Sequence, residues 1–178
     1  MLVEGCEFET ERLHVVEWHA FAERSERRFM LAEVVALMLT KGVTAVLPEQ
    51  WRGSYTTERA VAWIAQRDAE ATTLLAVTKR EEVPVGLLVL DESAAQKGRG
   101  IEVRIGYLLA EEHWGQGFAT ELVAGLVAWC RTQVEIVSLV AGVAHGNEAS
   151  RRVLEKNGFQ LAGDEPQVIT CRLDLHEP

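Results

Sequence analysis

The sequence lacks a long hydrophobic run. Although 48% of its 178 residues are hydrophobic, no stretch approaches the roughly 18 consecutive apolar residues that a membrane-spanning helix needs. The first residues, MLVEGCEFETER, are acidic from the fourth position and lack the basic start and apolar segment of a secretory signal. We therefore expect a cytoplasmic protein that has no membrane partner.

Basic residues are scarce relative to acidic ones. Lys and Arg number 18 against 27 Asp and Glu, which gives a formal net charge of −9 and a pI near 5.1. Such a surface repels a phosphate polymer unless a local basic patch intervenes. The balance argues against a general nucleic-acid binder, whereas an acidic surface tolerates amine substrates.

Cysteine is sparse too, and its copies fit no metal-binding pattern. Cys6, Cys130 and Cys171 are an odd number, they lack metal-ligand spacing, and Cys130 falls in an apolar run with helical periodicity. We expect reduced, partly buried thiols and no metal site.

The chain also lacks internal repeats, low-complexity segments and linkers that would mark a domain boundary. Its length and composition are those of a soluble globular domain that can bury a core without covalent staples. We expect one domain spanning residues 1–178.

What is present is a hydrophobic periodicity that switches between strand-like and helix-like segments. Strands are expected at residues 7–17, 73–79, 83–91, 101–109, 136–144, 159–162 and 168–175. Helices are expected within 18–41, ending at Gly42; from Thr56 or Thr57 to 68; from about 118 to 130; and from an Asn147 N-cap to a left-handed stop at Asn157-Gly158. Residues 94–100 form a turn-rich break. This order predicts a mixed α/β (α+β) chain around one sheet.

Two of the expected helices show a one-sided apolar pattern. In the later helix the pattern comprises Ala119, Leu122, Val123, Leu126, Val127 and Cys130. In the earlier helix, Val61, Ile64, Ala65 and Asp68 fall at helical spacing, which predicts a short amphipathic helix.

The loop HWGQGFATEL, residues 113–122, places Gly115 and Gly117 directly before a helix. Glycines there let backbone N–H groups converge, and the positive end of the helix dipole attracts an anion such as a phosphate. A dinucleotide-binding G-x-G-x-x-G fits poorly, because AEEHW separates the glycines from the strand and several strands precede it. A P-loop is excluded, since no Gly-Lys-Ser/Thr follows. By composition alone, a plain tight connection fits equally well.

Two longer segments, IGYLLAEEHWGQGFATELV and GNEASRRVLEKNGF, resemble the GNAT acyltransferase superfamily, in the branch similar to ribosomal-protein N-terminal acetyltransferases. The family signature Q/R-x-x-G-x-G/A is matched from Trp114 to Ala119, with Trp in the first place. FETERLHV resembles the first strand of this branch, and Asn147-x-x-Ser150 matches its last helix. The resemblance implies a mostly antiparallel central sheet that is flanked by helices and splayed between its fourth strand, here 101–109, and its fifth, here 136–144.

The resemblance also implies acetyl-CoA as co-substrate. Its pyrophosphate would be bound by the loop and helix start, and its pantetheine arm would pair with the fourth strand where that strand splays, a place that Gly106 eases. Asn147 and Ser150 would contact the cofactor from the last helix. The full cofactor-binding set is Tyr107, Leu108, Leu109, Ala110, Trp114, Gly115, Gln116, Gly117, Phe118, Ala119, Thr120, Asn147 and Ser150.

Acetyl transfer to an amine requires a neutral nucleophile, a polarised thioester carbonyl and a proton for the thiolate. Backbone N–H groups near Leu108 and Leu109 are the expected hydrogen-bond donors to the oxyanion that develops on the thioester oxygen. The resemblance makes Ser150 the proton donor or a hydrogen-bond partner of the arm. Glu102 and His145 are the candidate bases, although Arg104 occupies a position that is often acidic in this branch.

The resemblance implies a primary amine as acceptor, either a protein N-terminal α-amine or a small molecule, and no residue pattern selects between them. Trp51 and Tyr55 are expected to line its pocket. Arg151 and Arg152 meet the 3′-phosphate of coenzyme A or balance neighbouring glutamates. Two alternatives remain. The first is an acyl-CoA-binding module without catalysis, and the second is a dinucleotide binder.

Overall fold

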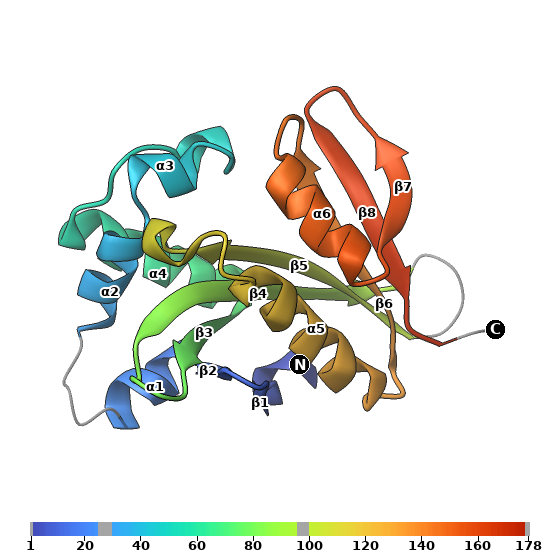
Figure 1. Cartoon of the computed structure of the whole chain (residues 1–178), viewed down its shortest axis with the longest axis horizontal. Helices are drawn as coiled ribbons and strands as arrows, with labels where there is room; N and C mark the ends of the chain where they lie inside the picture. The colour runs from blue at the N-terminus through green and yellow to red at the C-terminus, as the bar shows by residue number, and fades with distance from the viewer. Residues whose placement is uncertain (1, 25–29, 96–99, 177–178) are drawn as a thin grey trace.

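The computed structural model describes residues 2–24, 30–95 and 100–176, and within them eight strands form one sheet in the order β1-β2-β3-β4-β5-β6-β8-β7 (Figure 1). Neighbouring strands are antiparallel except β5 and β6, which run parallel. The strands are β1 (Phe8–Glu9), β2 (Leu13–Glu17), β3 (Thr72–Thr78), β4 (Pro84–Ala94), β5 (Ile101–Leu109), β6 (Ile136–Ala144), β7 (Gln160–Asp164) and β8 (Val168–Asp174). The predicted fold class is confirmed, and the parallel sheet of a dinucleotide-binding fold is excluded.

Helices cover both faces of this sheet. They are α1 (Trp18–Arg24), α2 (Leu31–Met38), α3 (Lys41–Thr44), α4 (Thr57–Glu70), α5 (Phe118–Arg131) and α6 (Glu148–Lys156), with 3-10 turns η1 (Leu2–Gly5), η2 (Glu49–Trp51) and η3 (Glu111–His113). Across the three described ranges, no helix is both long and apolar enough to cross a membrane. Residues 25–29 of the predicted helical segment and 96–99 of the predicted turn lie outside the described residues.

The predicted helix ends are confirmed at three places. The Thr56 side chain accepts the Arg59 N–H and caps α4. The Asn147 side chain accepts the Ser150 N–H at 3.2 Å and caps α6. After α6, Gly158 has a φ of +87° and stops the helix in the left-handed region.

The first strand, predicted as one segment, is two strands joined by a tight turn. The Thr10 backbone N–H donates to the Leu13 carbonyl at 2.9 Å, and the Thr10 hydroxyl oxygen accepts the Leu13 N–H at 3.0 Å. This turn folds β1 back along β2, with Phe8 opposite Val15. The apolar positions change parity between Phe8 and Leu13, whereas a continuous strand keeps a period of two.

The sequence predicted that a helix ends at Gly42. This prediction is wrong, because Gly42 lies inside α3. Thr40 starts α3, because its hydroxyl oxygen accepts the Val43 N–H at 3.2 Å. A Cβ on Gly42 would collide with the Glu111 carboxylate. Glycine at this position leaves room for the Glu111 side chain, which would otherwise have to move aside.

Two apolar clusters pack on opposite faces of the sheet. On β3, Leu74 and Ala76 belong to the cluster under α5, whereas Leu75 and Val77 belong to the cluster with α2 and α4. This alternation is the pleat of a strand buried on both faces.

The burial of α5 confirms its predicted apolar face, with Leu122, Val123, Leu126, Val127 and Cys130 all buried. The predicted face of α4 is wrong by about one position. Its buried residues are Ala60, Trp63, Ile64 and Arg67. Val61 is 55% exposed, and the buried Arg67 stands where a periodicity count does not expect a charge.

The sheet splays between β5 and β6, as predicted. Their parallel ladder runs from Ile101 opposite Ile136 to Ile105 opposite Ala141 and ends there. Beyond it, residues 106–109 continue to pair with β4, and residues 142–144 continue to pair with β8. The two strands therefore diverge, and α6, β7 and β8 rise on one side of the opening while α3 rises on the other (Figure 1).

All three cysteines are free and buried. Burial raises the pKa of each thiol, to about 12 for Cys130. Unpaired, buried thiols are what the sequence predicted.

Candidate active site

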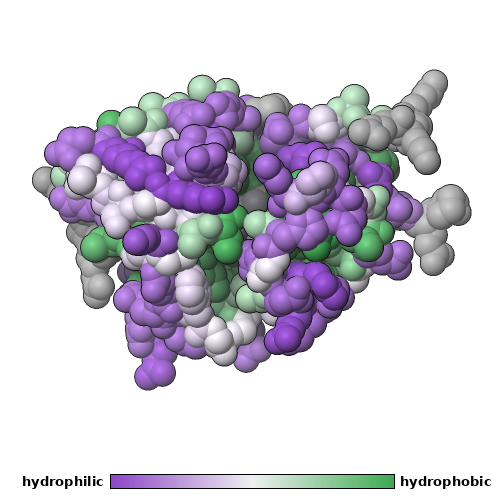
Figure 2. Space-filling view, turned by 90° about the horizontal axis from the view of Figure 1, so that it is seen from above, coloured by the Kyte–Doolittle hydropathy of each residue, from purple (hydrophilic) through white to green (hydrophobic). Residues whose placement is uncertain are grey.

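A cleft of about 860 Å³ lies over β4 and β5. One wall comes from residues 46–52 and α4, and the other from the ends of β6 and β8 and the start of α6. From above, apolar side chains lie in the hollow between two more hydrophilic lobes (Figure 2). The floor includes Gly106, where a Cβ would meet nothing nearer than 4.0 Å.

The glycine loop forms the N-terminus of α5. Gly115 has a φ of +73°, and Gly117, the N-cap, has φ and ψ of 84° and −1°. No side chain caps the helix, and its first bond runs from the Glu121 N–H to the Gly117 carbonyl. An α-helix leaves its first N–H groups without intrahelical partners, so those of Phe118, Ala119 and Thr120 are suited to bind an anion.

Trp114 attaches this loop to the splayed end of β5. Its indole Nε1 donates to the Leu109 carbonyl at 2.9 Å, while the residue is 51% exposed. Leu109 and Ala110 thus lie beside the start of the glycine loop. The predicted pantetheine-binding stretch, Tyr107 to Ala110, comprises the end of β5 that β6 does not pair and the residue that follows β5.

Tyr107 and Ser150 meet across the opening. The Tyr107 hydroxyl lies 2.8 Å from the Ser150 hydroxyl and 3.2 Å from the Ser150 carbonyl oxygen. Burial raises the pKa of Tyr107 to about 12, although the Ser150 bond acts in the opposite direction. The phenol therefore keeps its proton at neutral pH. Both residues line the cleft together with Asn147.

Glu102 is not among the residues that line the cleft. It is only 8% exposed, accepts a hydrogen bond from Ser138 Oγ at 3.2 Å, and is ion-paired with Arg172 of β8. A buried carboxylate requires such partners. The geometry gives Glu102 a structural ion pair, and its role as a base stays a prediction without a contact to support it.

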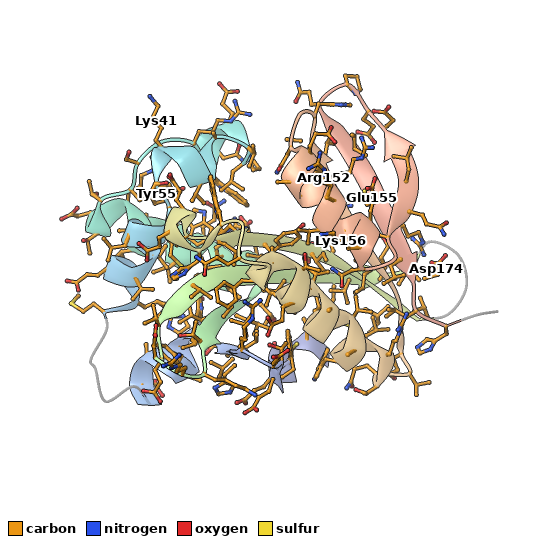
Figure 3. The ribbon with its side chains drawn as sticks, in the orientation of Figure 1. Lys41, Tyr55, Arg152, Glu155, Lys156 and Asp174 are labelled. Carbon is orange, nitrogen blue, oxygen red and sulfur yellow. The ribbon has the colours of Figure 1, made fainter. Side chains whose placement is uncertain are left out.

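Of the two aromatic residues predicted for the acceptor pocket, Trp51 lines the cleft and Tyr55 does not. Both pack edge-on against Trp63, with ring centroids 6.0 and 6.3 Å away, and the Tyr55 hydroxyl donates to the Trp51 carbonyl. Figure 3 shows Tyr55 on the lobe of α3 and α4, across the cleft from Arg152 on α6.

Arg67 is a cleft residue that the sequence did not reveal. It is 4% exposed, stacks 4.3 Å over the Trp51 ring, and forms an ion pair with Glu70 at 2.6 Å. The sequence feature that could have revealed its burial is its position in the apolar repeat of α4, four residues after Trp63. Its partner Glu70 also lines the cleft, so the two form an ion pair in the cleft wall.

Neighbouring strands of the sheet also contribute charged residues to the lining of the cleft. Asp91 of β4 lies directly opposite Arg104 of β5, and both line the cleft. His145 lines it from the end of β6, with Nε2 2.7 Å from the Glu165 carbonyl oxygen.

Arg151 forms ion pairs within α6, with Glu155 at 2.9 Å and Glu148 at 3.6 Å. These contacts match the second of its two predicted roles, the balance of neighbouring glutamates. Arg152 is exposed on the same helix.

The family profile of the "Acetyltransferase (GNAT) domain" matches residues 14–160, most of the chain. This chain belongs to the GNAT acetyltransferase family. Two solved structures share the GNAT fold at 17% identity. One is an acetyltransferase (GNAT family) from Bacillus anthracis, with a TM-score of 0.77 over 97% of this chain and 100% of that one. The other is RimL, the ribosomal L7/L12 alpha-N-protein acetyltransferase in complex with coenzyme A, with a TM-score of 0.70 over 93% and 96%.

Sequence relatives align over shorter stretches. The "Uncharacterized N-acetyltransferase YoaA" of Bacillus subtilis (strain 168) is 42% identical over 69 residues, which is 39% of this chain and 38% of that protein. The match thus spans well under two thirds of that relative. Membership of the GNAT family supports acetyl transfer from acetyl-CoA.

Proposed function

We propose that this chain is an N-acetyltransferase that moves an acetyl group directly from acetyl-CoA to a primary amine. The observation that carries the proposal is the opening between β5 and β6. It has a glycine loop at the end of β5, attached through Trp114, and an 860 Å³ cleft over β4 and β5. A thioester held in the opening would face an acceptor held in the cleft.

In this proposal the donor is held mainly by backbone. The pyrophosphate takes N–H groups from Gln116 to Thr120, where two glycines keep side chains away. The pantetheine arm adds to β5 at residues 107–110 as a further strand. Asn147 and Ser150 approach from the α6 side, and Trp114 and Gly115 shape the entrance.

The chemistry then needs groups that stabilise the oxyanion, groups that hydrogen-bond the departing sulfur, and groups that accept the proton of the amine. Backbone N–H groups near Leu108 and Leu109 stabilise the oxyanion that develops on the thioester oxygen. When Tyr107 donates to Ser150 Oγ, the Ser150 proton is free to hydrogen-bond the departing sulfur. A thiolate with a pKa of about 8.5 is a tolerable leaving group, so a hydrogen bond suffices and positioning contributes most of the rate.

The amine must lose a proton to react, since an alkylammonium pKa is roughly 10. Three carboxylates line the cleft, those of Glu49, Glu70 and Asp91, and Glu70 is paired with Arg67. Asp91 of β4 and the imidazole of His145 also line it. We assign proton acceptance to this pair, directly or through water, in preference to Glu102, which is held by Arg172.

Two cheap measurements test the proposal. The first is calorimetric titration with CoA and, separately, with NAD. The second is thiol release on mixing acetyl-CoA with a panel of N-terminal peptides, amino acids, polyamines and aminoglycosides. We expect CoA binding, no NAD binding, and thiol release that depends on one class of acceptor. Ser150→Ala should slow that release about ten- to hundredfold while the protein still binds CoA.

The alternative, an acyl-CoA-binding module without catalysis, is favoured by Arg104 at a family position that is often acidic and by the ion-paired state of Glu102. CoA binding with no acceptor-dependent thiol release across the whole panel would establish it. Failure to bind CoA would overturn both readings.

A further inference from the structure

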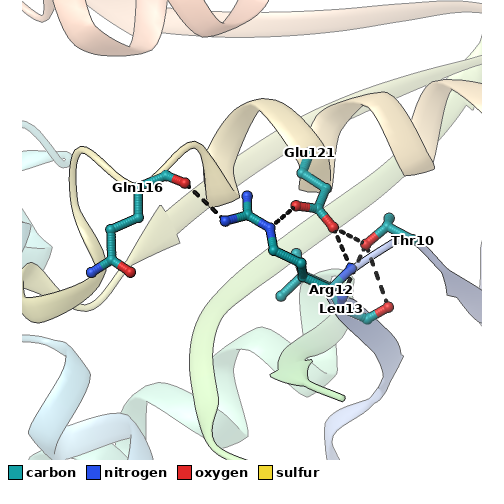
Figure 4. Close-up of polar contacts among 5 residues, drawn as sticks. All are labelled: Thr10, Arg12, Leu13, Gln116 and Glu121. Atoms are coloured by element: carbon teal, nitrogen blue, oxygen red, sulfur yellow. Dashed lines mark hydrogen bonds and ion pairs between the residues drawn. The ribbon is translucent and has the colours of Figure 1, made fainter. Parts of the chain in front are cut away.

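Arg12, in the turn between β1 and β2, reaches the glycine loop from a part of the chain about 100 residues away (Figure 4). Its guanidinium Nη1 donates to the Gln116 carbonyl at 3.0 Å, and its Nε donates to the Glu121 carboxylate at 2.6 Å. The same guanidinium lies 4.2 Å over the Phe118 ring. A Cβ placed on Gly117 would be 3.5 Å from its Nη2.

Glu121 holds Arg12 in this position. One oxygen of the carboxylate accepts the Arg12 backbone N–H at 2.7 Å and the Thr10 hydroxyl, and the other accepts Arg12 Nε. Burial raises the pKa of Glu121, but these hydrogen bonds outweigh it, and the pKa is lowered overall. The carboxylate is therefore charged at neutral pH and fixes the arginine from both ends.

The bond to Gln116 decides which way one peptide group points. In a trans peptide the C=O and the following N–H point in opposite directions. Because Arg12 holds the Gln116 carbonyl on its own side, the Gly117 N–H is directed away from Arg12, toward the side left open for the anion.

A peptide flanked by glycine needs such a restraint. The Gly117 φ and ψ of 84° and −1° are those of the third residue of a type II turn. Rotation of the Gln116–Gly117 peptide converts type II geometry into type I, and glycine accepts both at little cost. After that rotation a carbonyl oxygen, rather than an N–H, would face the phosphates.

We propose that Arg12 is a positioning residue that holds the Gln116–Gly117 peptide in its anion-binding orientation, with Glu121 as the anchor of Arg12. This inference rests on the proposed function, since it concerns the site of the CoA pyrophosphate. Arg12 acts through backbone, so its effect is confined to ligands that carry the pyrophosphate.

The test compares two ligands on four proteins. CoA and pantetheine, which lacks the pyrophosphate, are titrated calorimetrically into the wild type, Arg12→Met, Arg12→Lys and Glu121→Gln. We expect Arg12→Met to weaken CoA binding about tenfold, the effect of one charge-assisted hydrogen bond, and to leave pantetheine binding unchanged within about twofold. Arg12→Lys should recover little, because an ammonium cannot keep the forked geometry, and Glu121→Gln should give a smaller CoA-specific loss.

Arg59 supplies the matched control. It also stacks on an aromatic ring, 4.0 Å from Tyr55, and donates to loop carbonyls, those of Ser54 and Arg52, but it does so on the other side of the cleft. Arg59→Met should leave CoA affinity unchanged.

The outcomes separate the two proposals. A wild type that fails to bind CoA overturns the proposed function. If the wild type and Arg12→Met bind CoA equally tightly, the role of Arg12 is overturned and the proposed function is not. Equal loss of CoA and pantetheine binding also overturns it, because a general structural role would then explain the result. Should Arg12→Met not fold, Arg12→Lys and Glu121→Gln carry the same comparison.

Discussion

The two sides of the proposed site, one for the acetyl donor and one for the acceptor, are built in different ways. The donor side, residues 107–120, offers backbone groups on a strand end, a glycine loop and a helix start, and its shape depends on glycine φ angles. The acceptor side, residues 46–55 with α4, offers side chains that already contact one another, such as Trp51, Trp63 and Arg67. The backbone groups of the proposed donor site therefore come mainly from one contiguous stretch, with Asn147 and Ser150 added from α6, whereas the proposed acceptor site is formed by packing between segments.

The largest expected difference between the two sides is one of stability. Trp63→Ala on the acceptor side removes a side chain that is 5% exposed and packs against Trp18, Trp51 and Tyr55. We expect it to lower the free energy of unfolding by about 3–5 kcal/mol. Trp114→Ala on the donor side removes a half-exposed ring with one hydrogen bond, and should cost less than about 1.5 kcal/mol. Denaturant titration measures both, and equal losses would contradict the comparison.

Tyr107, on the donor side, gives a prediction about pH. An unfolded tyrosine ionises near pH 10, whereas the folded protein holds this phenol neutral to about 12. Its contribution to stability is therefore complete below pH 10 and declines as the pH rises toward 12.

The chain has two tyrosines, so Tyr55→Phe leaves Tyr107 as the sole source of phenolate absorbance. We expect that absorbance to appear about two pH units above the ordinary value. Phenolate at pH 10 in a protein that is still folded would disprove the burial argument.

Gly117→Ala tests the backbone character of the donor side. A side chain at a φ of +84° costs about 1–2 kcal/mol in the left-handed region, so we expect CoA affinity to fall about tenfold as the loop relaxes. Gly5→Ala is the control, because a Cβ there meets nothing within 4 Å. If calorimetry shows the same CoA affinity for both variants, the loop conformation does not matter for binding.

The smallest expected effect is that of Tyr55→Phe, on the acceptor side. It deletes the hydroxyl that donates to the Trp51 carbonyl and should cost about 1 kcal/mol of stability. CoA affinity should not change. A changed CoA affinity would show that the two sides are coupled through the Trp51 loop.

Local features of the sequence predicted most of the fold. The α5 stripe, the Asn147 cap and the Gly158 stop depend on neighbours within a few residues, so periodicity and capping rules suffice for them. The splay followed from family resemblance and not from the residues alone.

Three features that the sequence did not reveal depend on contacts between different segments. Gly42 resembles a helix stop until Glu111, 69 residues later, is placed against it. The arginine that pairs with Glu102 is Arg172 of β8, 70 residues later in the chain. Arg67 breaks the apolar pattern of α4 because the Trp51 ring, supplied by another segment, covers its guanidinium. No local rule contains these partners.

The buried cysteines have a consequence for measurement. Since burial raises the pKa of Cys6, Cys130 and Cys171, and only thiolates react with disulfide dyes, the native protein should contribute almost no colour of its own. The absorbance change would then come almost entirely from the thiol of coenzyme A that the reaction releases. The same dye added to denatured protein should count three thiols per chain, so that one reagent reports both turnover and the fraction of protein that has lost its fold.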